Sequence, residues 1–170
     1  KDRVRAAILN CNLRMPDGRI TVNLSPADLP KEGVRFDLPI ALGILAASEQ
    51  VVRPPFESCE LYGELSLGGE IRPVRGALLA ATAAARAGHR MIVPPINVAE
   101  TLLVPGCRVA VAKHLLDVVA GEFGEFVAAA RLSTHEQADD ERAFLLEEED
   151  VLGLLVVDVP VGGVGQHHGL

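Results

Sequence analysis

Residues 38–48 constrain the fold most, because they are apolar on nearly every side of the helix that they would form. A helix without a polar face is stable only when it is covered all round, so we predict that this one lies in the interior. Asp37 precedes the run and is a residue type favoured at a helix N-cap. The rest of the chain must therefore supply further layers of structure around a central helix.

The remaining pattern alternates between helices and strands. Residues 2–12 have apolar positions at helical spacing, and residues 20–24 alternate between apolar and polar side chains as a strand does. Glu60 to Ile71 is predicted to form a hairpin that turns at Gly68 and Gly69. Helices are then expected at 76–87, 97–103 and 113–120, and strands at 91–93 and 107–112. This order predicts an α/β or α+β layer fold.

Charge divides the chain into a nearly neutral body and an acidic tail. Residues 1–120 carry 14 basic and 12 acidic side chains, whereas residues 121–170 carry 2 basic and 11 acidic ones. Neither part has the strongly basic composition typical of non-specific DNA binding. We expect one domain over 1–120, an acidic linker or solvated helix over 121–150, and an apolar strand with a Gly-rich end over 151–170. The strand, at 151–159, would dock on an open sheet edge or pair with a second copy. The alternative for this run is a disordered, aggregation-prone end.

Cysteine usage and hydropathy indicate a cytoplasmic protein. Cys11, Cys59 and Cys107 are far apart, without the spacing of a zinc site or a redox pair, and are expected to be reduced, buried thiols. No apolar run is long enough to cross a membrane, and the first residues do not resemble a signal peptide. His167 and His168 have no third ligand nearby, so no metal site is predicted.

Two long motifs carry a family resemblance. The first comprises residues 19–48 and includes Pro30-Lys-Glu-Gly33, and the second comprises residues 60–94 and includes Gly68-Gly-Glu-Ile-Arg-Pro-Val-Arg-Gly76. Together they resemble the N-terminal domain of the magnesium-chelatase-like ATPases of the ComM/YifB type, which are linked to DNA branch migration in competence. The resemblance covers about residues 1–120. It implies the layer fold shared by Lon proteases and the second domain of a ribosomal small-subunit protein, here truncated at its N-terminus.

The resemblance also indicates which chemistry this chain lacks. Arg35 stands where Lon proteases have their nucleophilic serine, and Leu78 falls near the position of their general-base lysine. A guanidinium is not a nucleophile, and a leucine cannot accept a proton. The phosphate loop that binds ATP is also absent from the sequence, since Gly162 to Gly165 are not followed by its Lys and Ser or Thr. We therefore expect no catalysis and no cofactor in this chain, with ATP and magnesium bound by the parent ATPase.

Three functions remain open at this stage. The first is a non-catalytic accessory domain of an AAA+ ATPase, for assembly or substrate contact. The second is a degenerate Lon-type serine peptidase, and the third is a stand-alone interaction module with an acidic tail. Arg35, Arg72 and Arg75 flank the lost catalytic positions, where they would contact an anionic group or else be merely solvated or ion-paired. Expected partners are the parent ATPase module, DNA through the parent, and a second copy of the chain, but no membrane.

Overall fold

The computed structural model describes residues 2–24, 34–51, 58–121, 127–128 and 155–158. The α-helices in these ranges are α1 (Asp2–Asn10), α2 (Asp37–Ala47), α3 (Ala77–Arg86), α4 (Val98–Thr101) and α5 (Leu115–Ala120). Two 3-10 turns, η1 (Val34–Phe36) and η3 (Pro95–Asn97), lead into α2 and α4. The strands are β1 (Thr21–Leu24), β2 (Cys59–Leu61), β3 (Glu64–Leu65), β4 (Ile71–Arg72), β5 (Arg90–Val93), β6 (Arg108–Val111), β7 (Val127–Ala128) and β8 (Leu155–Asp158).

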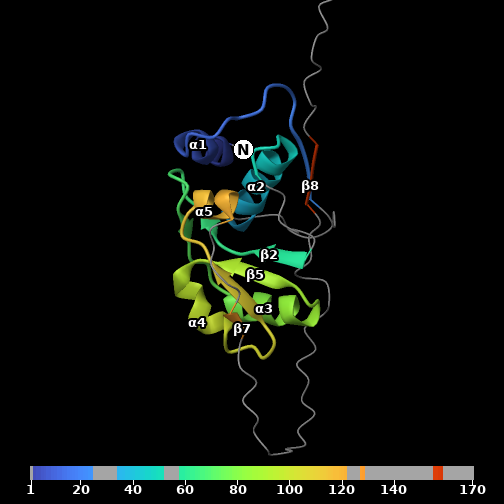
Figure 1. Ribbon diagram of the computed structural model, residues 1–170, viewed down its shortest axis with the longest axis vertical. Coiled ribbons are helices and arrows are strands. Elements are labelled where there is room, and N and C mark those ends of the chain that lie inside the picture. The colour runs from blue at the N-terminus through green and yellow to red at the C-terminus, as the bar shows by residue number, and fades with distance from the viewer. Residues whose placement is uncertain (1, 25–33, 52–57, 122–126, 129–154, 159–170) are drawn as a thin grey trace, which may run out of the picture.

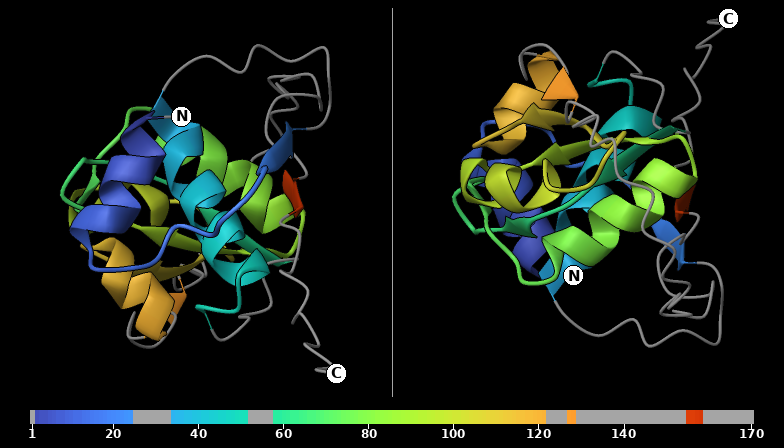
Figure 2. Two further views of the ribbon diagram at one scale, coloured as in Figure 1. Left: turned by 90° about the horizontal axis from the view of Figure 1, so that it is seen from above. Right: turned by 90° about the horizontal axis from the view of Figure 1, so that it is seen from below.

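A four-stranded sheet in the order β2-β5-β6-β7 forms the middle layer. The first three strands are parallel and β7 is antiparallel to β6. Helices α1, α2 and α5 lie on one side of this sheet and α3 and α4 on the other, as Figure 1 and the two views of Figure 2 show. The α/β class predicted from the sequence is therefore confirmed.

Large aliphatic side chains fill the space between the sheet and α1, α2 and α5. Helix α2 has the all-round apolar pattern noted above, and it contributes the largest share of this core, as predicted. The buried residues of α2 are Leu38, Ala41, Leu42, Ile44 and Leu45. They meet α1, α5 and the strand residues Ile92 and Ala110.

Small residues dominate the opposite face of the sheet. The alanines of α3 pack against β5 and β6, with buried members Ala80, Ala81, Ala84, Met91, Val93, Cys107 and Val109. Strand β5 serves both cores because its side chains alternate, with Met91 and Val93 on this face and Ile92 on the other. Gly88, with φ of 71°, follows the end of α3, as the sequence predicts.

The hairpin predicted over 60–71 is wrong in its extent. Residues Glu60 and Leu61 belong to β2, which pairs with β5 rather than with the chain that follows it. The hairpin is instead formed by β3 and β4, with Leu65 opposite Ile71. Leu67 lies in the turn and is 53% exposed, whereas Leu65 is buried. The alternation of apolar residues continues past Gly63, where the chain leaves the sheet. The pattern therefore does not show that β2 and β3 are separate strands.

The turn of the β3–β4 hairpin is held tightly between α1 and α5. Gly69 has φ of 93°, and a Cβ atom there would collide with the Cys11 sulfur and the His114 ring. A ring nitrogen of His114 lies 3.0 Å from the Gly68 carbonyl oxygen, while its Nδ1 accepts from the Leu116 amide as the cap of α5. Glycine is therefore required at position 69 by both backbone geometry and space.

Asp37 does not cap α2, contrary to the sequence prediction. Turn η1 runs directly into the helix, so Asp37 is the first helical residue and Phe36 occupies the cap position without a side-chain hydrogen bond. The Asp37 carboxylate instead binds Arg3, with 3.0 Å between Oδ2 and Nε. The ion pair with Arg3 on α1 thus takes the place of the hydrogen bond that the Asp37 carboxylate was predicted to accept from the backbone of α2.

Strands from distant parts of the chain form a separate two-stranded sheet. β1 pairs antiparallel with β8, so that Thr21 lies opposite Asp158 and Leu24 opposite Leu155. β8 also lies against α2. It falls within the apolar run 151–159 for which the sequence predicts a docked strand. The rest of that run and the acidic stretch 133–150 lie outside the described residues. None of the described helices is long and apolar enough to span a membrane.

Candidate functional site

Tyr62 marks the centre of the candidate site, at the carboxyl end of β2. It directly follows that strand, and its amide donates to the Ile92 carbonyl over 3.0 Å. In open α/β sheets, ligands bind outside the carboxyl ends of the parallel strands. The position of Tyr62 in the fold is therefore one where a functional surface is expected.

Two exposed arginines lie beside Tyr62. The Tyr62 hydroxyl donates to the backbone carbonyl of Arg75 over 2.8 Å. Burial raises the pKa of Tyr62, and the positive charge of Arg35 opposes this rise, so Arg35 lies within electrostatic reach of the hydroxyl. The Arg35 guanidinium also lies 5.4 Å from the centre of the Phe36 ring, within cation–π range. In the part of the chain that the structure describes, neither Arg35 nor Arg75 forms an ion pair. Their charges are thus available to an anionic group.

The Tyr62 hydroxyl remains protonated at neutral pH. Burial is the main cause that raises its pKa, and the negative charge of Glu100 raises it further, against the smaller opposing effect of Arg35. A protonated hydroxyl is a hydrogen-bond donor, so the bond to the Arg75 carbonyl persists at neutral and mildly alkaline pH.

Residues 74–78, which join the hairpin to α3, are fastened by two further side chains. The Asn97 amide donates to the Val74 carbonyl over 3.0 Å and accepts from the Val74 amide over 3.2 Å. The Glu100 carboxylate accepts from the Leu78 amide over 3.1 Å, in the first turn of α3. Gly76 permits the sharp entry into the helix because its φ is 90°. We call these residues the 74–78 segment. Its backbone is held in place by these bonds, and Arg75 extends from it.

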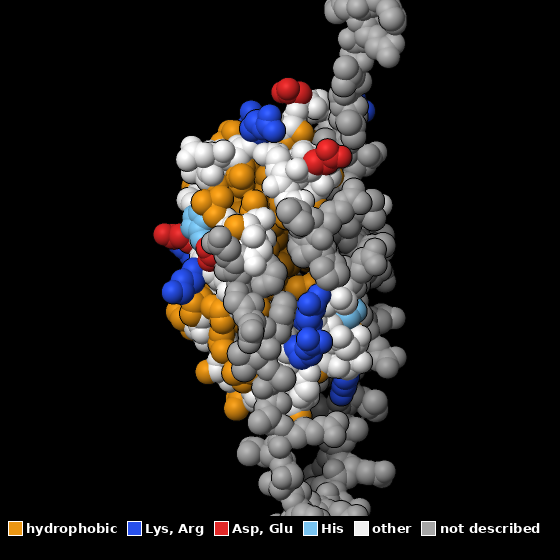
Figure 3. Space-filling model, in the orientation of Figure 1, with side chains coloured by type: hydrophobic (Ala, Val, Ile, Leu, Met, Phe, Trp, Pro, Cys, Tyr) orange, Lys and Arg blue, Asp and Glu red, His pale blue; other side chains and the backbone are white. Residues whose placement is uncertain are grey.

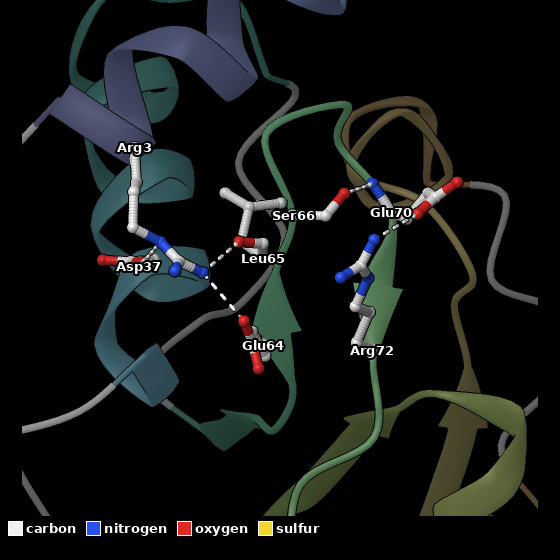
Figure 4. Close-up of polar contacts among 7 residues, drawn as sticks. All are labelled: Arg3, Asp37, Glu64, Leu65, Ser66, Glu70 and Arg72. Atoms are coloured by element: carbon white, nitrogen blue, oxygen red, sulfur yellow. Dashed lines mark hydrogen bonds and ion pairs between the residues drawn. The ribbon is translucent and has the colours of Figure 1, made fainter.

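Arg72 stands apart from this arrangement. It lies on β4 with its side chain 60% exposed, and it pairs with Glu70 over 3.4 Å (Figure 4). Among the described contacts, Arg72 has none with Arg35 or Arg75. The structure thus places the backbone of Arg75 and the charge of Arg35 near Tyr62, and leaves Arg72 paired on the hairpin.

A second charged cluster, centred on Arg3, was missed by the sequence analysis. Arg3 binds the carboxylates of Asp37 and Glu64, over 3.0 and 2.9 Å, and donates to the Leu65 carbonyl (Figure 4). The hydrogen bond to Glu64, together with both negative charges, raises the pKa of Arg3. The cluster joins α1, α2 and β3, with one guanidinium shared between two carboxylates. It therefore ties these three elements together, and no short-range spacing could have indicated it.

The two residues that the resemblance places at the Lon dyad, Arg35 and Leu78, both lie at the surface. Arg35 is exposed on η1, and Leu78 lies at the surface of α3 with its amide bound to Glu100. Residues 30–33 of the same motif lie outside the described residues. On the face drawn in Figure 3, the described basic and acidic side chains lie among apolar ones.

The thiols and the metal-ligating residue types offer no second site in the described ranges. Cys11 and Cys107 are buried, and burial raises the pKa of each. For Cys59, burial raises the pKa to about 11, and the opposing charge of Arg90 only partly offsets it. All three thiols are therefore protonated at neutral pH. Within the described residues, no three His, Cys, Asp or Glu side chains are placed to hold a metal ion.

Comparisons with known proteins identify the family. The family model for subunit ChlI of Mg-chelatase matches residues 1–97. Protein YifB of Salmonella typhimurium is 51% identical over 120 residues, which is 71% of this chain and 24% of YifB. Competence protein ComM of Haemophilus influenzae is 48% identical over 119 residues, covering 70% of this chain and 23% of ComM. These alignments have the length that the motif analysis predicts.

A Mycobacterium tuberculosis protein extends the similarity into the acidic tail. It is 38% identical over 171 residues, which is 99% of this chain and 33% of that protein. The tail, which the motifs left unassigned, thus has a counterpart in a relative. This chain spans about a quarter to a third of the length of these relatives. On these matches, the chain belongs to the magnesium-chelatase ChlI family, in the group that contains YifB and ComM.

Proposed function

We propose that these residues form a non-catalytic accessory domain of a magnesium-chelatase-like AAA+ ATPase, with the layer fold of the Lon proteolytic domain. Its task is to contact the nucleic acid or protein on which the ATPase acts, or to assist assembly of the ATPase. The observation that carries this proposal is the pair of exposed arginines, Arg35 and Arg75, which form no ion pair with another described residue and lie near Tyr62 at the carboxyl edge of the sheet.

The physical case for anion contact rests on where these charges lie. An exposed arginine with no carboxylate partner keeps its hydrogen-bond donors for a ligand, and its planar fork matches phosphate oxygens. Arg75 also sits on a fastened backbone, so little order has to be created when a ligand binds. Arg72 contributes less in this proposal, because Glu70 already neutralises part of its charge.

A peptidase function is the weaker alternative. Nucleophilic catalysis needs a nucleophile within reach of a base. Arg35 and Leu78 occupy the two aligned positions, and neither side chain can play its part. We expect no turnover of unfolded casein and no labelling by a serine-reactive fluorophosphonate. Labelling of one serine that also abolishes turnover would reverse this assignment.

The parent protein supplies the remaining parts of the proposal. ATP and magnesium would be bound by the AAA+ module of the parent, which works in the cytoplasm. The domain would contact that module, meet DNA as part of the parent, and associate with further copies of itself. The Haemophilus relative is a competence protein by name, which supports a role in DNA handling.

Binding of fluorescein-labelled branched, single-stranded and duplex DNA at several salt concentrations tests the proposal. The decisive variant is Arg35→Ala/Arg75→Ala, and the matched control is Arg86→Ala, which removes an exposed arginine from the far end of α3. Each phosphate contact contributes close to one unit to the slope of log affinity against log salt. We expect the double variant to lose affinity and about one to two units of slope, and the control to keep both. If both proteins behave like the wild type, a stand-alone interaction module becomes the better assignment.

A further inference from the structure

The backbone carbonyl of Arg75 is held by the Tyr62 hydroxyl, which could be removed while the ring stays packed against the core. Of the three groups that fasten the 74–78 segment, Asn97 is almost completely buried, so its loss would leave the polar groups of Val74 unsatisfied and weaken the fold itself. The Tyr62 side chain is only partly buried, and its hydroxyl makes a single described hydrogen bond to the chain. Tyr62 is the one tyrosine of the sequence, which also makes it a unique probe.

The direction of the Arg75 side chain depends on the peptide to which the Tyr62 hydroxyl is bonded. A side chain that must meet an anion with both arms of its guanidinium needs its Cα held within a small range of positions. Without the bond from Tyr62, the carbonyl of Arg75 would turn more freely, and ordering it again would oppose binding. The protonated state of Tyr62, described above, keeps this donor in place at neutral pH.

We infer that Tyr62 is a positioning residue for anion contact, acting through the backbone of Arg75 rather than by touching the ligand. This inference rests on the proposed function, since it assigns a role to Tyr62 only if Arg75 contacts an anion. Asn97 and Glu100 hold the two ends of the same segment, and Tyr62 holds its middle. The three together turn a connecting loop into a rigid support for one side chain.

A double-mutant cycle on the whole 170-residue chain separates this role from direct contact. The proteins are the wild type, Tyr62→Phe, Arg75→Ala and the double variant. The probe is a fluorescein-labelled single-stranded oligonucleotide at low salt. We expect Arg75→Ala to weaken binding about three- to tenfold and Tyr62→Phe about two- to fivefold. In the Arg75→Ala background, Tyr62→Phe should cause no further loss, because it acts only through that arginine.

Thr82→Ala is the matched control, since it removes a hydroxyl that bonds to the Leu78 carbonyl within the same helix. It should leave affinity unchanged. Tyr62→Phe should shift the urea midpoint no more than Thr82→Ala does. It should also speed hydrogen exchange of the Ala80 amide, which donates to the Gly76 carbonyl.

The outcomes distinguish the inference from the proposal beneath it. If Arg75→Ala binds like the wild type, the anion contact of the proposed function is wrong. If Arg75→Ala binds weakly while Tyr62→Phe binds normally, the contact stands and the positioning role is wrong. Equal losses from Tyr62→Phe in both backgrounds would show that Tyr62 touches the ligand itself, which also overturns the inference.

Discussion

The two faces of the central sheet are packed by opposite means. The face toward α1, α2 and α5 is filled by large branched side chains such as Ile8, Leu42 and Leu45. On the face toward α3, the helix contributes only alanines to the buried core. On the first face, large side chains fill the space between the helices and the sheet. On the second, small side chains let α3 lie close to the sheet. The first face should therefore be most sensitive to loss of side-chain volume, and the contact between α3 and the sheet to added volume.

The largest effect is expected on the face built from large side chains. Leu42 is 1% exposed in the middle of α2, so Leu42→Ala would leave a cavity that its neighbours cannot close. We expect the free energy of unfolding to fall by about 2–5 kcal/mol, measured by urea titration. Leu79→Ala is the control, because Leu79 lies exposed on α3. Comparable losses in the two variants would show that the large core is less well packed than described.

A smaller loss is expected when a side chain is enlarged on the alanine face. Ala81 is fully buried between α3 and the sheet, so Ala81→Leu would push the helix away from β5. The expected cost is about 1–3 kcal/mol in the same titration. Ala99→Leu, on the exposed side of α4, provides the control and should be nearly neutral. If Ala81→Leu were neutral as well, the contrast between the faces would not hold.

At alkaline pH, the wild type should lose more unfolding free energy than a variant without Cys59, a residue that packs against the large core. Its folded pKa of about 11 is raised by burial, so the unfolded chain loses this proton at a lower pH than the folded chain. The corresponding stability is complete below about pH 9 and is lost as pH rises toward 11, by about 1–2 kcal/mol. In Cys59→Ala, the fall in unfolding free energy between pH 7 and pH 10.5 should be smaller. An identical fall in both proteins would contradict the burial of this thiol.

The smallest effect is expected on the hairpin surface. Arg72 and Glu70 are both more than half exposed, and solvent screens such a pair. Arg72→Ala should change the free energy of unfolding by less than about 0.5 kcal/mol. A loss above about 1 kcal/mol in urea titration would mean that this pair supports the turn between α1 and α5.

The elements that follow from short-range pattern could be predicted from the sequence, and the contacts between distant segments could not. The apolar run 38–48 and the alanine run 76–87 indicate helices because each contains its own periodicity. The partner of β2 has no such signal, since apolar alternation continues through Gly63 and suggests a longer hairpin. The two-residue β7 was not predicted either, because so short a strand has no pattern of its own.

The same limit applies to the candidate site. Arg35 and Arg75 could be named from a motif, but Tyr62, Asn97 and Glu100 could not. Their roles arise only when the fold brings them to residues 74–78 from positions 13 to 23 residues away in the chain. The pairing of Arg72 with Glu70, two residues away on the same hairpin, is a contact that spacing alone could have suggested.

The pairing of β1 with β8 has a consequence for the order in which the chain folds. The register that joins Thr21 to Asp158 closes most of the sequence into one loop. Closing a longer loop costs more conformational entropy, and such long-range contacts slow folding. The β2–α3–β5 and β5–α4–β6 units need only neighbouring segments, so they can assemble while a ribosome is still making the acidic stretch. β1 has to wait for its partner until residues 155–158 emerge, and this two-stranded sheet is therefore the last part of the described structure to form.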